Sequence, residues 1–200
     1  MRKALLIVSV AVFGLSFGGG EQAVSTFTDK RDGKVYRIVE IGGAVWMAEN
    51  LNYAAKGSVC YRDKNANCDK YGRLYNWETA LKACPAGFHL PTADEWTALT
   101  DAVGGDDIAG TKLKSAAGWN KDGNGTNDFG WSALPGGYGT SDGYFGYAGY
   151  YGYWWSATEN DANYARGRYM NYYYEIVNWY NYGKTSLFSV RCVQDKEGEQ

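Results

Sequence analysis

Histidine is scarce in this sequence, and basic residues are not in excess. One histidine among 200 residues leaves little material for histidine-based catalysis or a histidine-rich metal site. Lysine and arginine number 20 against 22 acidic residues, giving a net charge of −2. A protein that neutralises phosphates needs a basic surplus, so the composition argues against nucleic acid as a partner. With 45% hydrophobic and 21% charged residues, a disordered polyelectrolyte is also excluded.

Long apolar runs are missing as well, apart from one short run at the N-terminus. Met1-Arg2-Lys3 precedes a largely apolar segment at 4–17, which is short for a membrane anchor of about 20 residues. A charged start, a short apolar centre and small residues after it are typical of a secretory signal. We expect a cleaved signal peptide at 1–20, a linker at 21–27, one domain at 28–195 and a polar tail at 196–200. The mature protein would be secreted or held in the cell envelope, with no membrane span after signal removal.

Cysteine is limited to four residues, Cys60, Cys68, Cys84 and Cys192. An even number in an exported chain indicates two disulfides, for which three pairings exist. Cys60 and Cys68 flank a short polar loop, which favours a local bridge and leaves Cys84 to pair with Cys192. A metal site is the alternative, although the spacings do not resemble paired C-x2-C ligands.

The first half of the chain carries the clearest secondary-structure signals. Residues 34–41 predict a strand, and Gly-Gly then leads to a partner strand at 45–47. The apolar spacing over 71–84 predicts a helix. Thr92 followed by Glu95 is a capping box, which predicts a helix that ends at Gly104-Gly105.

The second half reads as loops and strands. Residues 118–158 are rich in Gly, Asn and Asp, with a strand predicted over 152–158. The alternation over 187–193 predicts a final strand, with Ser189 and Arg191 on the polar face. These elements predict an α+β domain.

Five segments of the chain, in order, carry a family resemblance. They are DGKVYRIVEIGGAVWMAENLNY, CYRDKNANCDKYGRLYNWETALKACPAGFHLPTADEW, KLKSAAGWNKDGNGTNDFGWSALPGG, WWSATE and SVRCV. Together they resemble the Fibrobacter succinogenes major paralogous domain family. The resemblance implies a C-type lectin-like fold, with two helices packed on short antiparallel sheets, long loops and a Cys84–Cys192 bridge. It implies an exported protein but no established activity, and the Glu-Pro-Asn and Gln-Pro-Asp triplets of calcium-dependent sugar-binding lectins do not occur.

Aromatic residues are abundant where the loops are. Thirteen of the 18 tyrosines fall between Tyr138 and Tyr182, and a core cannot readily bury so many hydroxyl groups with partners. We therefore expect part of this tract to form a recognition surface; the alternative is that the tyrosines pack on each other across strands. The residues expected to bind a ligand are Trp154, Trp155, Tyr164, Tyr169, Tyr172, Tyr173, Tyr174, Trp179, Tyr180 and Tyr182.

Other polar clusters give weaker signals. Oxygen-bearing residues alternate at Asp122, Asn124, Thr126 and Asp128, which is a weak calcium candidate, with an Asx-rich turn as the favoured alternative. No other cofactor is expected. The acidic pairs at 94–95 and 106–107 are explained by helix capping and by a solvated loop, and His89 by packing or capping, so we expect no catalytic site.

The sequence thus predicts a non-catalytic binding module at the cell surface or outside it. Its partner would be a polysaccharide or a surface protein, recognised by the aromatic tract. A structural or adhesive protein that self-associates is one alternative, and a glycan-processing enzyme with paired carboxylates is another.

Overall fold

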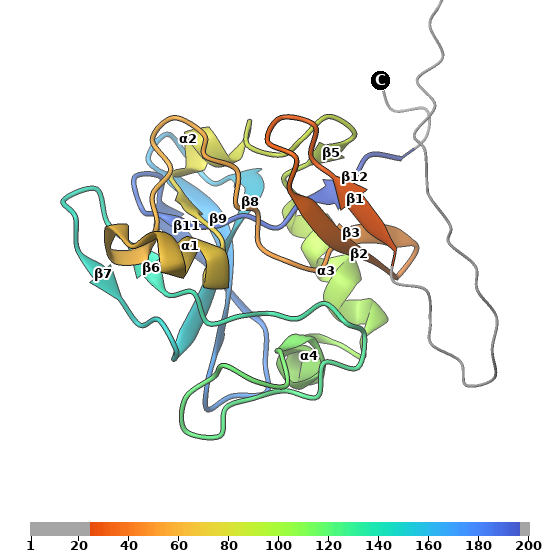
Figure 1. Cartoon of the computed structure of the whole chain (residues 1–200). Coiled ribbons are helices and arrows are strands. Elements are labelled where there is room, and N and C mark those ends of the chain that lie inside the picture. Colours follow the sequence, from red (N-terminus) through yellow and green to blue (C-terminus); the bar gives the residue numbers. More distant parts are fainter. Residues whose placement is uncertain (1–24, 197–200) are drawn as a thin grey trace, which may run out of the picture.

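The computed structural model describes residues 25–196. The predicted signal peptide and all but the first residue of the predicted tail lie outside this range. The described part is a mixed α+β domain, in which two five-stranded sheets and one two-stranded sheet are joined by long loops (Figure 1). None of the helices in this part is long and apolar enough to cross a membrane.

The first sheet has the strand order β1-β2-β3-β12-β5. Its strands are β1 (Thr26–Thr28), β2 (Val35–Ile41), β3 (Ala44–Met47), β12 (Val193–Gln194) and β5 (Phe88–His89). The predicted hairpin is confirmed, because β2 and β3 pair antiparallel. The turn between them uses Gly42 and Gly43 at φ of 63° and 76°, a conformation that glycine adopts without a steric penalty.

The end of the predicted linker is part of this sheet. Thr26 and Phe27 pair with β2, and the Phe27 ring packs on Phe88 with centroids 4.6 Å apart. The last two residues of the predicted linker are therefore part of the first sheet, where strand pairing and the Phe27 ring hold them on the domain.

The second sheet has the order β10-β9-β8-β11-β4. Its strands are β10 (Asn178–Gly183), β9 (Tyr164–Asn171), β8 (Tyr151–Glu159), β11 (Phe188–Ser189) and β4 (Leu74–Tyr75), and a separate hairpin joins β6 (Tyr138–Gly139) to β7 (Phe145–Gly146). The strand predicted over 152–158 is confirmed as part of β8. All neighbours in the second sheet are antiparallel except β8 and β11.

The predicted final strand over 187–193 is two strands. β11 belongs to the second sheet and β12 to the first, so residues 190–192 cross from one sheet to the other. The expected polar face is buried, since Ser189 is 1% and Arg191 0% exposed. A segment that passes between two sheets has protein on both sides, and alternation does not reveal this.

The helix predicted over 71–84 is confirmed only over the four residues of α2 (Trp77–Ala80). The 3-10 turn η1 (Tyr61–Asp63) and helix α1 (Asn65–Tyr71) precede Gly72, and β4 lies between Gly72 and α2. Gly72 has φ 76°, which ends α1, and the Asn76 side chain then caps α2 by accepting from the Thr79 N–H at 2.9 Å.

Helix α3 (Ala93–Ala102) is confirmed, with both hydrogen bonds of the Thr92–Glu95 capping box in place. Helix α4 (Asp106–Leu113) was not expected, and Asp106 and Asp107 form its first turn rather than a solvated loop. Its apolar pattern is interrupted by Gly110, where a Cβ would lie 2.5 Å from the Glu175 carbonyl oxygen. Gly110 therefore weakens the helical pattern in the sequence, and it also allows α4 to pack closely against the backbone at Glu175.

A cluster of tryptophans lies where the two sheets and α3 meet. Trp46, Trp96, Trp131 and Trp154 are at most 1% exposed, and the centroids of neighbouring rings lie 5.4–6.4 Å apart. Aromatic pairs at such distances contribute beyond the burial of their area. This tryptophan cluster joins β3, α3, β8 and the loop before β6 into one core.

Both predicted disulfides are confirmed, Cys60–Cys68 and Cys84–Cys192. The second bridge links the segment after α2 to the crossing segment 190–192 and encloses 108 residues. It thereby fixes the place where the last strands enter the two sheets.

Candidate functional site

Strand alternation brings tyrosines from three strands to one face of the second sheet. Tyr151 and Tyr153 lie two residues apart on β8 and so point to the same side. The same face receives Asn171 and Tyr169, which pair with them on β9, and Tyr180 and Tyr182 from β10. Side chains that share a face on neighbouring strands contact each other. The pairing of β8, β9 and β10 therefore brings together tyrosines that are far apart in the sequence.

These residues line a shallow groove of about 280 Å³. The lining of this tyrosine groove is Tyr151, Tyr153, Tyr169, Asn171, Tyr173, Tyr174, Tyr180 and Tyr182. Its surface therefore consists of aromatic rings, phenolic hydroxyls and one amide, with no charged side chain.

The inner tyrosines are held by ring packing. Tyr153 stacks on Phe188 at a centroid distance of 5.1 Å and on Tyr169 at 6.0 Å, and the Tyr182 ring meets Phe188 edge-on at 4.8 Å. Burial raises the pKa of the Tyr153, Tyr169 and Tyr182 hydroxyls. The phenols therefore stay neutral at physiological pH.

The rim of the groove is exposed. Tyr173, Tyr174 and Tyr180 are 51%, 50% and 65% exposed. The hydroxyls of Tyr151 and Tyr173 lie 3.4 Å apart, and this hydrogen bond, together with burial, raises the pKa of Tyr151 to about 12. Large amphipathic rings at a rim are well suited to contact a ligand.

The loop that carries the rim is fixed from beneath. The Asn171 side-chain oxygen accepts from the backbone N–H groups of Tyr173 at 3.2 Å and Tyr174 at 2.8 Å. Lys114, only 4% exposed, donates to the carbonyls of Asn171 at 3.3 Å and Tyr174 at 3.1 Å, and its burial lowers its pKa. The groove is thus largely pre-formed, which reduces the entropy lost on binding.

Comparison with known proteins places the chain in a family. The family model of the Fibrobacter succinogenes major domain matches residues 39–194. The chain belongs to this family. No curated protein and no solved structure matches it. Every residue of the tyrosine groove lies inside the matched Fibrobacter succinogenes major domain.

Two of the predicted ligand-binding residues are core residues of this domain. Trp154 and Trp155 are both 0% exposed. Trp154 belongs to the tryptophan cluster and donates its indole N–H to Asn50 Oδ1 at 2.8 Å, while Trp155 donates to the Tyr75 carbonyl. The prediction is wrong for both, because the central strand β8 is covered on both faces at this point.

Three other predicted residues do not line the groove. Tyr164 and Trp179, 47% and 50% exposed, have the opposite parity on β9 and β10 and face the side of the sheet that carries α3. Tyr172 is not part of the lining, and its ring packs edge-on against Tyr150 at 5.4 Å and against the rim residue Tyr173 at 4.8 Å. The groove retains Tyr169, Tyr173, Tyr174, Tyr180 and Tyr182 from the prediction.

Tyr151, Tyr153 and Asn171 line the groove but were not predicted as ligand-binding residues. The signal for the two tyrosines was present in the sequence, since they alternate with Gly152 on a predicted strand. The signal for Asn171 was absent, because its role depends on the loop that it caps.

The weak calcium candidate is a packed turn. The Asn124 side-chain oxygen accepts from the Trp119 N–H at 3.0 Å, and the Thr126 hydroxyl donates to the Thr111 carbonyl at 3.3 Å, so both side chains hold the turn together. A Cβ on Gly123 would lie 2.4 Å from the Tyr172 carbonyl oxygen, which shows how closely this turn supports the rim loop. Within residues 25–196, no three His, Cys, Asp or Glu side chains gather as a metal site requires.

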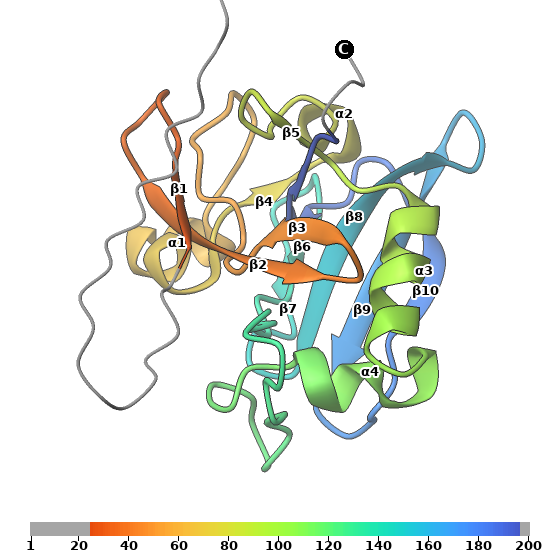
Figure 2. The same ribbon diagram turned by 90° about the vertical axis from the view of Figure 1, so that its right-hand side faces the viewer.

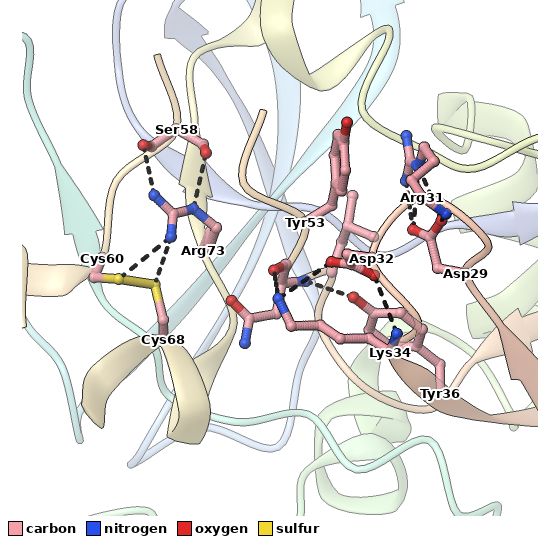
Figure 3. Close-up of polar contacts among 12 residues, drawn as sticks. Asp29, Arg31, Asp32, Lys34, Tyr36, Tyr53, Ser58, Cys60, Cys68 and Arg73 are labelled. Carbon is pink, nitrogen blue, oxygen red and sulfur yellow. Dashed lines mark hydrogen bonds and ion pairs between the residues drawn. A yellow bond between two sulfur atoms is a disulfide. The ribbon is translucent and has the colours of Figure 1, made fainter. Parts of the chain in front are cut away.

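A second polar region lies around β2 and α1 (Figure 3). It borders a cavity of about 190 Å³, and four of its ionic groups form two ion pairs. Asp29 binds Arg31 at 2.7 Å, and Lys34 contacts Asp32 at 3.2 Å and the Asn52 carbonyl at 2.5 Å. Such pairing indicates a structural role for this region.

Figure 3 also shows Arg73 beside the local disulfide. Its guanidinium donates to the Ser58 hydroxyl at 2.8 Å and the Ser58 carbonyl at 2.9 Å, and it lies 3.6 Å from the sulfurs of both Cys60 and Cys68. Arg73 thus ties the disulfide loop to β4.

His89 bridges two carboxylates at the start of α3. Its Nε2 lies 2.8 Å from Glu95 and its Nδ1 2.7 Å from Asp195. Both ring nitrogens are engaged, so His89 connects β5, α3 and the segment after β12. It lies outside the tyrosine groove.

Proposed function

We propose that the protein is an exported binding module that holds an uncharged carbohydrate chain in the tyrosine groove. The observation that carries this proposal is the lining of seven tyrosines and one asparagine without a charged side chain. A neutral lining disfavours ionic ligands, since they would lose hydration without gaining a counter-charge.

The chemistry of the lining suits sugars. Aromatic faces offer apolar area against which the C–H faces of sugar rings can stack, and the hydroxyl at the end of each ring can donate or accept a hydrogen bond. The raised pKa values of Tyr151, Tyr153 and Tyr182 keep these hydroxyls as donors. Binding of this kind needs no chemical step, and we propose a non-catalytic role.

Export and fold belong to the same proposal. Two disulfides suit an oxidising compartment, and the charged and apolar N-terminus has the pattern of a secretory signal. The lectin-like architecture inferred from the family resemblance also belongs to the proposal, and a long-loop face on a disulfide-linked α+β scaffold is consistent with it.

The test is affinity gel electrophoresis of the oxidised protein in gels containing soluble neutral polysaccharides (xylan, mannan, mixed-linkage glucan) or acidic pectin. We expect at least one neutral polysaccharide to retard the protein, pectin to have less effect, and the polymer to be recovered at unchanged length. Tyr173→Ala and Tyr180→Ala should each weaken binding by about tenfold, because exposed rings at a contact contribute on the order of 1 kcal/mol or more.

Tyr164→Ala is the matched control, since Tyr164 is similarly exposed on the opposite face of the sheet. Equal loss of binding in Tyr164→Ala and Tyr180→Ala would refute the groove as the site. Capture of a surface protein by the groove, with no retardation by any neutral polysaccharide, would replace carbohydrate with a protein partner.

A further inference from the structure

Strand β10 is the outer strand of the second sheet, and its far edge is unpaired. The sheet order ends at β10, and Figure 2 shows the strand at the outer side of the sheet beside α3. Among the described residues, the backbone groups of Asn178–Tyr182 hydrogen-bond only to β9. One side of the strand therefore presents free N–H and C=O groups, which form a template for a further strand.

The devices that usually protect such an edge are missing from β10. Proteins block edge strands with charged side chains, proline, bulges or a short strand length. Asn178–Gly183 contains no charged residue and no proline, and its six residues pair with β9 without a register shift. Two of its side chains, Trp179 and Tyr180, are 50% and 65% exposed.

We infer that β10 pairs antiparallel with β10 of a second copy of this chain, across a two-fold axis that runs through the middle of the strand. In an antiparallel pair, residues that face each other share a face of the sheet. A two-fold axis normal to the sheet therefore keeps Tyr180 and Tyr182 of both copies on the same side. The two tyrosine grooves then form one continuous aromatic face on a ten-stranded sheet.

A second copy suits this edge better than a charged peptide does. An isologous contact places each side chain near its own equivalent, so any charge on β10 would repel itself, and β10 has none. The pairing also brings exposed aromatic side chains together across the new strand pair, which is favourable. Two linked grooves would hold a repeating polymer more tightly than one groove does.

The test is sedimentation velocity of the oxidised protein over a wide concentration range, together with hydrogen–deuterium exchange of the same samples. We expect a monomer–dimer equilibrium, with protection of the 178–183 amides rising as dimer accumulates. The variant Asn178→Lys/Asn181→Lys places four positive charges along the new strand pair, so the dimer should weaken by about tenfold or more, because the like charges of the two copies repel each other.

The matched control is Thr26→Lys/Thr28→Lys, which adds the same charge to exposed positions on β1, an edge of the other sheet. This variant should dimerise as the parent does. A protein that stays monomeric at every concentration overturns the inference, as does a dimer whose 178–183 amides gain no protection or that is weakened equally by both variants. Loss of the dimer should lower the affinity for a long polymer and leave binding to a single groove in place. A monomeric protein that still binds carbohydrate therefore overturns only this inference, and a dimer that binds none overturns only the proposed function.

Discussion

Arg191 is a charged residue held entirely by neutral oxygens. Its guanidinium donates to Asn50 Oδ1 at 3.1 and 2.9 Å, to the Met47 carbonyl at 3.2 Å and to the Trp131 carbonyl, and it lies 3.9 Å from the Trp131 ring centroid. Burial lowers the pKa of Arg191 to about 9, which leaves it charged at neutral pH. The planar fork of donors suits several acceptors at once in a way that an ammonium does not.

We predict that Arg191→Lys destabilises the fold by about 2–4 kcal/mol, because buried acceptors lose their donors while a charge remains buried. Urea denaturation of the oxidised protein measures this change. Arg62→Lys, at an exposed position, is the control and should cost less than about 0.5 kcal/mol. Similar losses in both variants would contradict the role assigned to Arg191.

His89 makes stability depend on pH. Burial lowers its pKa, but the hydrogen bonds with Asp195 and Glu95 outweigh burial and raise the pKa above 6.5. Stabilisation by His89 is therefore complete below pH 6.5 and is lost as pH rises through the raised value. Burial raises the pKa of Glu95, but bonds from Thr92 and His89 outweigh it and lower the pKa below 4.5, so its stabilisation is lost as pH falls through the lowered value.

The two effects together predict a stability maximum between about pH 4.5 and 6.5. Melting temperatures measured from well below pH 4.5 to well above pH 6.5 should show a decline on both sides of this range. His89→Gln should reduce the loss of melting temperature above pH 6.5. The loss on the acid side should remain. An unchanged alkaline slope in His89→Gln would assign the pH dependence to other groups.

Among the elements, the segment around Gly72 shows how one backbone position can override a periodic pattern. The apolar spacing over 71–84 is helical, yet α1 ends at Tyr71 and β4 begins at Leu74. A Cβ on Gly72 would lie 2.7 Å from the Asn50 Cβ and 2.9 Å from the Leu51 carbonyl oxygen. The close approach of this distant segment, which the local sequence does not show, ends the helix.

We predict that Gly72→Ala destabilises the protein by roughly 2–5 kcal/mol, because φ 76° with ψ −174° is a conformation that essentially only glycine adopts and the added Cβ would also overlap with backbone. Gly33→Ala is a matched control, because Gly33 has the same φ of 76° and nothing within 4 Å of an added Cβ. Gly33→Ala should lower the unfolding free energy only by the cost of positive φ for a residue with a Cβ, about 1–2 kcal/mol. Unfolding free energies of the two variants test this, and an equal loss in both would contradict a contribution from close packing at Gly72.

The elements that the sequence predicts correctly are those specified locally. Helix α3 has its capping box, and the β2–β3 hairpin has its two glycines at the turn. Helix α4 and the β11–β12 crossing are specified by contacts with remote segments, such as Glu175 against Gly110. Local periodicity carries no information about such contacts.

At the scale of the whole molecule, the two disulfides differ in what they constrain. Cys60–Cys68 closes 8 residues and Cys84–Cys192 closes 108. The chain-entropy estimate gives about 2.5 and about 4.8 kcal/mol. Both cysteine pairs were predictable because their spacings leave one local and one long-range bridge.

We predict that Cys84→Ser/Cys192→Ser lowers the unfolding free energy by about 2 kcal/mol more than Cys60→Ser/Cys68→Ser does. Urea denaturation of the two double variants tests this, with mass mapping to confirm the remaining bridge. An equal or smaller loss for the long bridge would show that native packing, rather than chain entropy, sets its contribution.

The candidate site was partly predictable. Composition identified the tract, because so many phenols between Tyr138 and Tyr182 exceed what a core can satisfy. It did not separate the groove from the core, since Trp154 and Tyr153 are neighbours in sequence but point to opposite faces of β8. That separation requires the strand register and the knowledge of which face α3 covers.

The burial of the tryptophans has an optical consequence. Seven of the eight indoles are at most 7% exposed, and Trp179 on β10 is 50% exposed. A water-soluble quencher should therefore extinguish the emission of Trp179 while leaving the shorter-wavelength emission of the shielded indoles. The native protein thus has two distinguishable fluorescence signals. The buried tryptophans report on the core, and Trp179 reports on the edge strand β10.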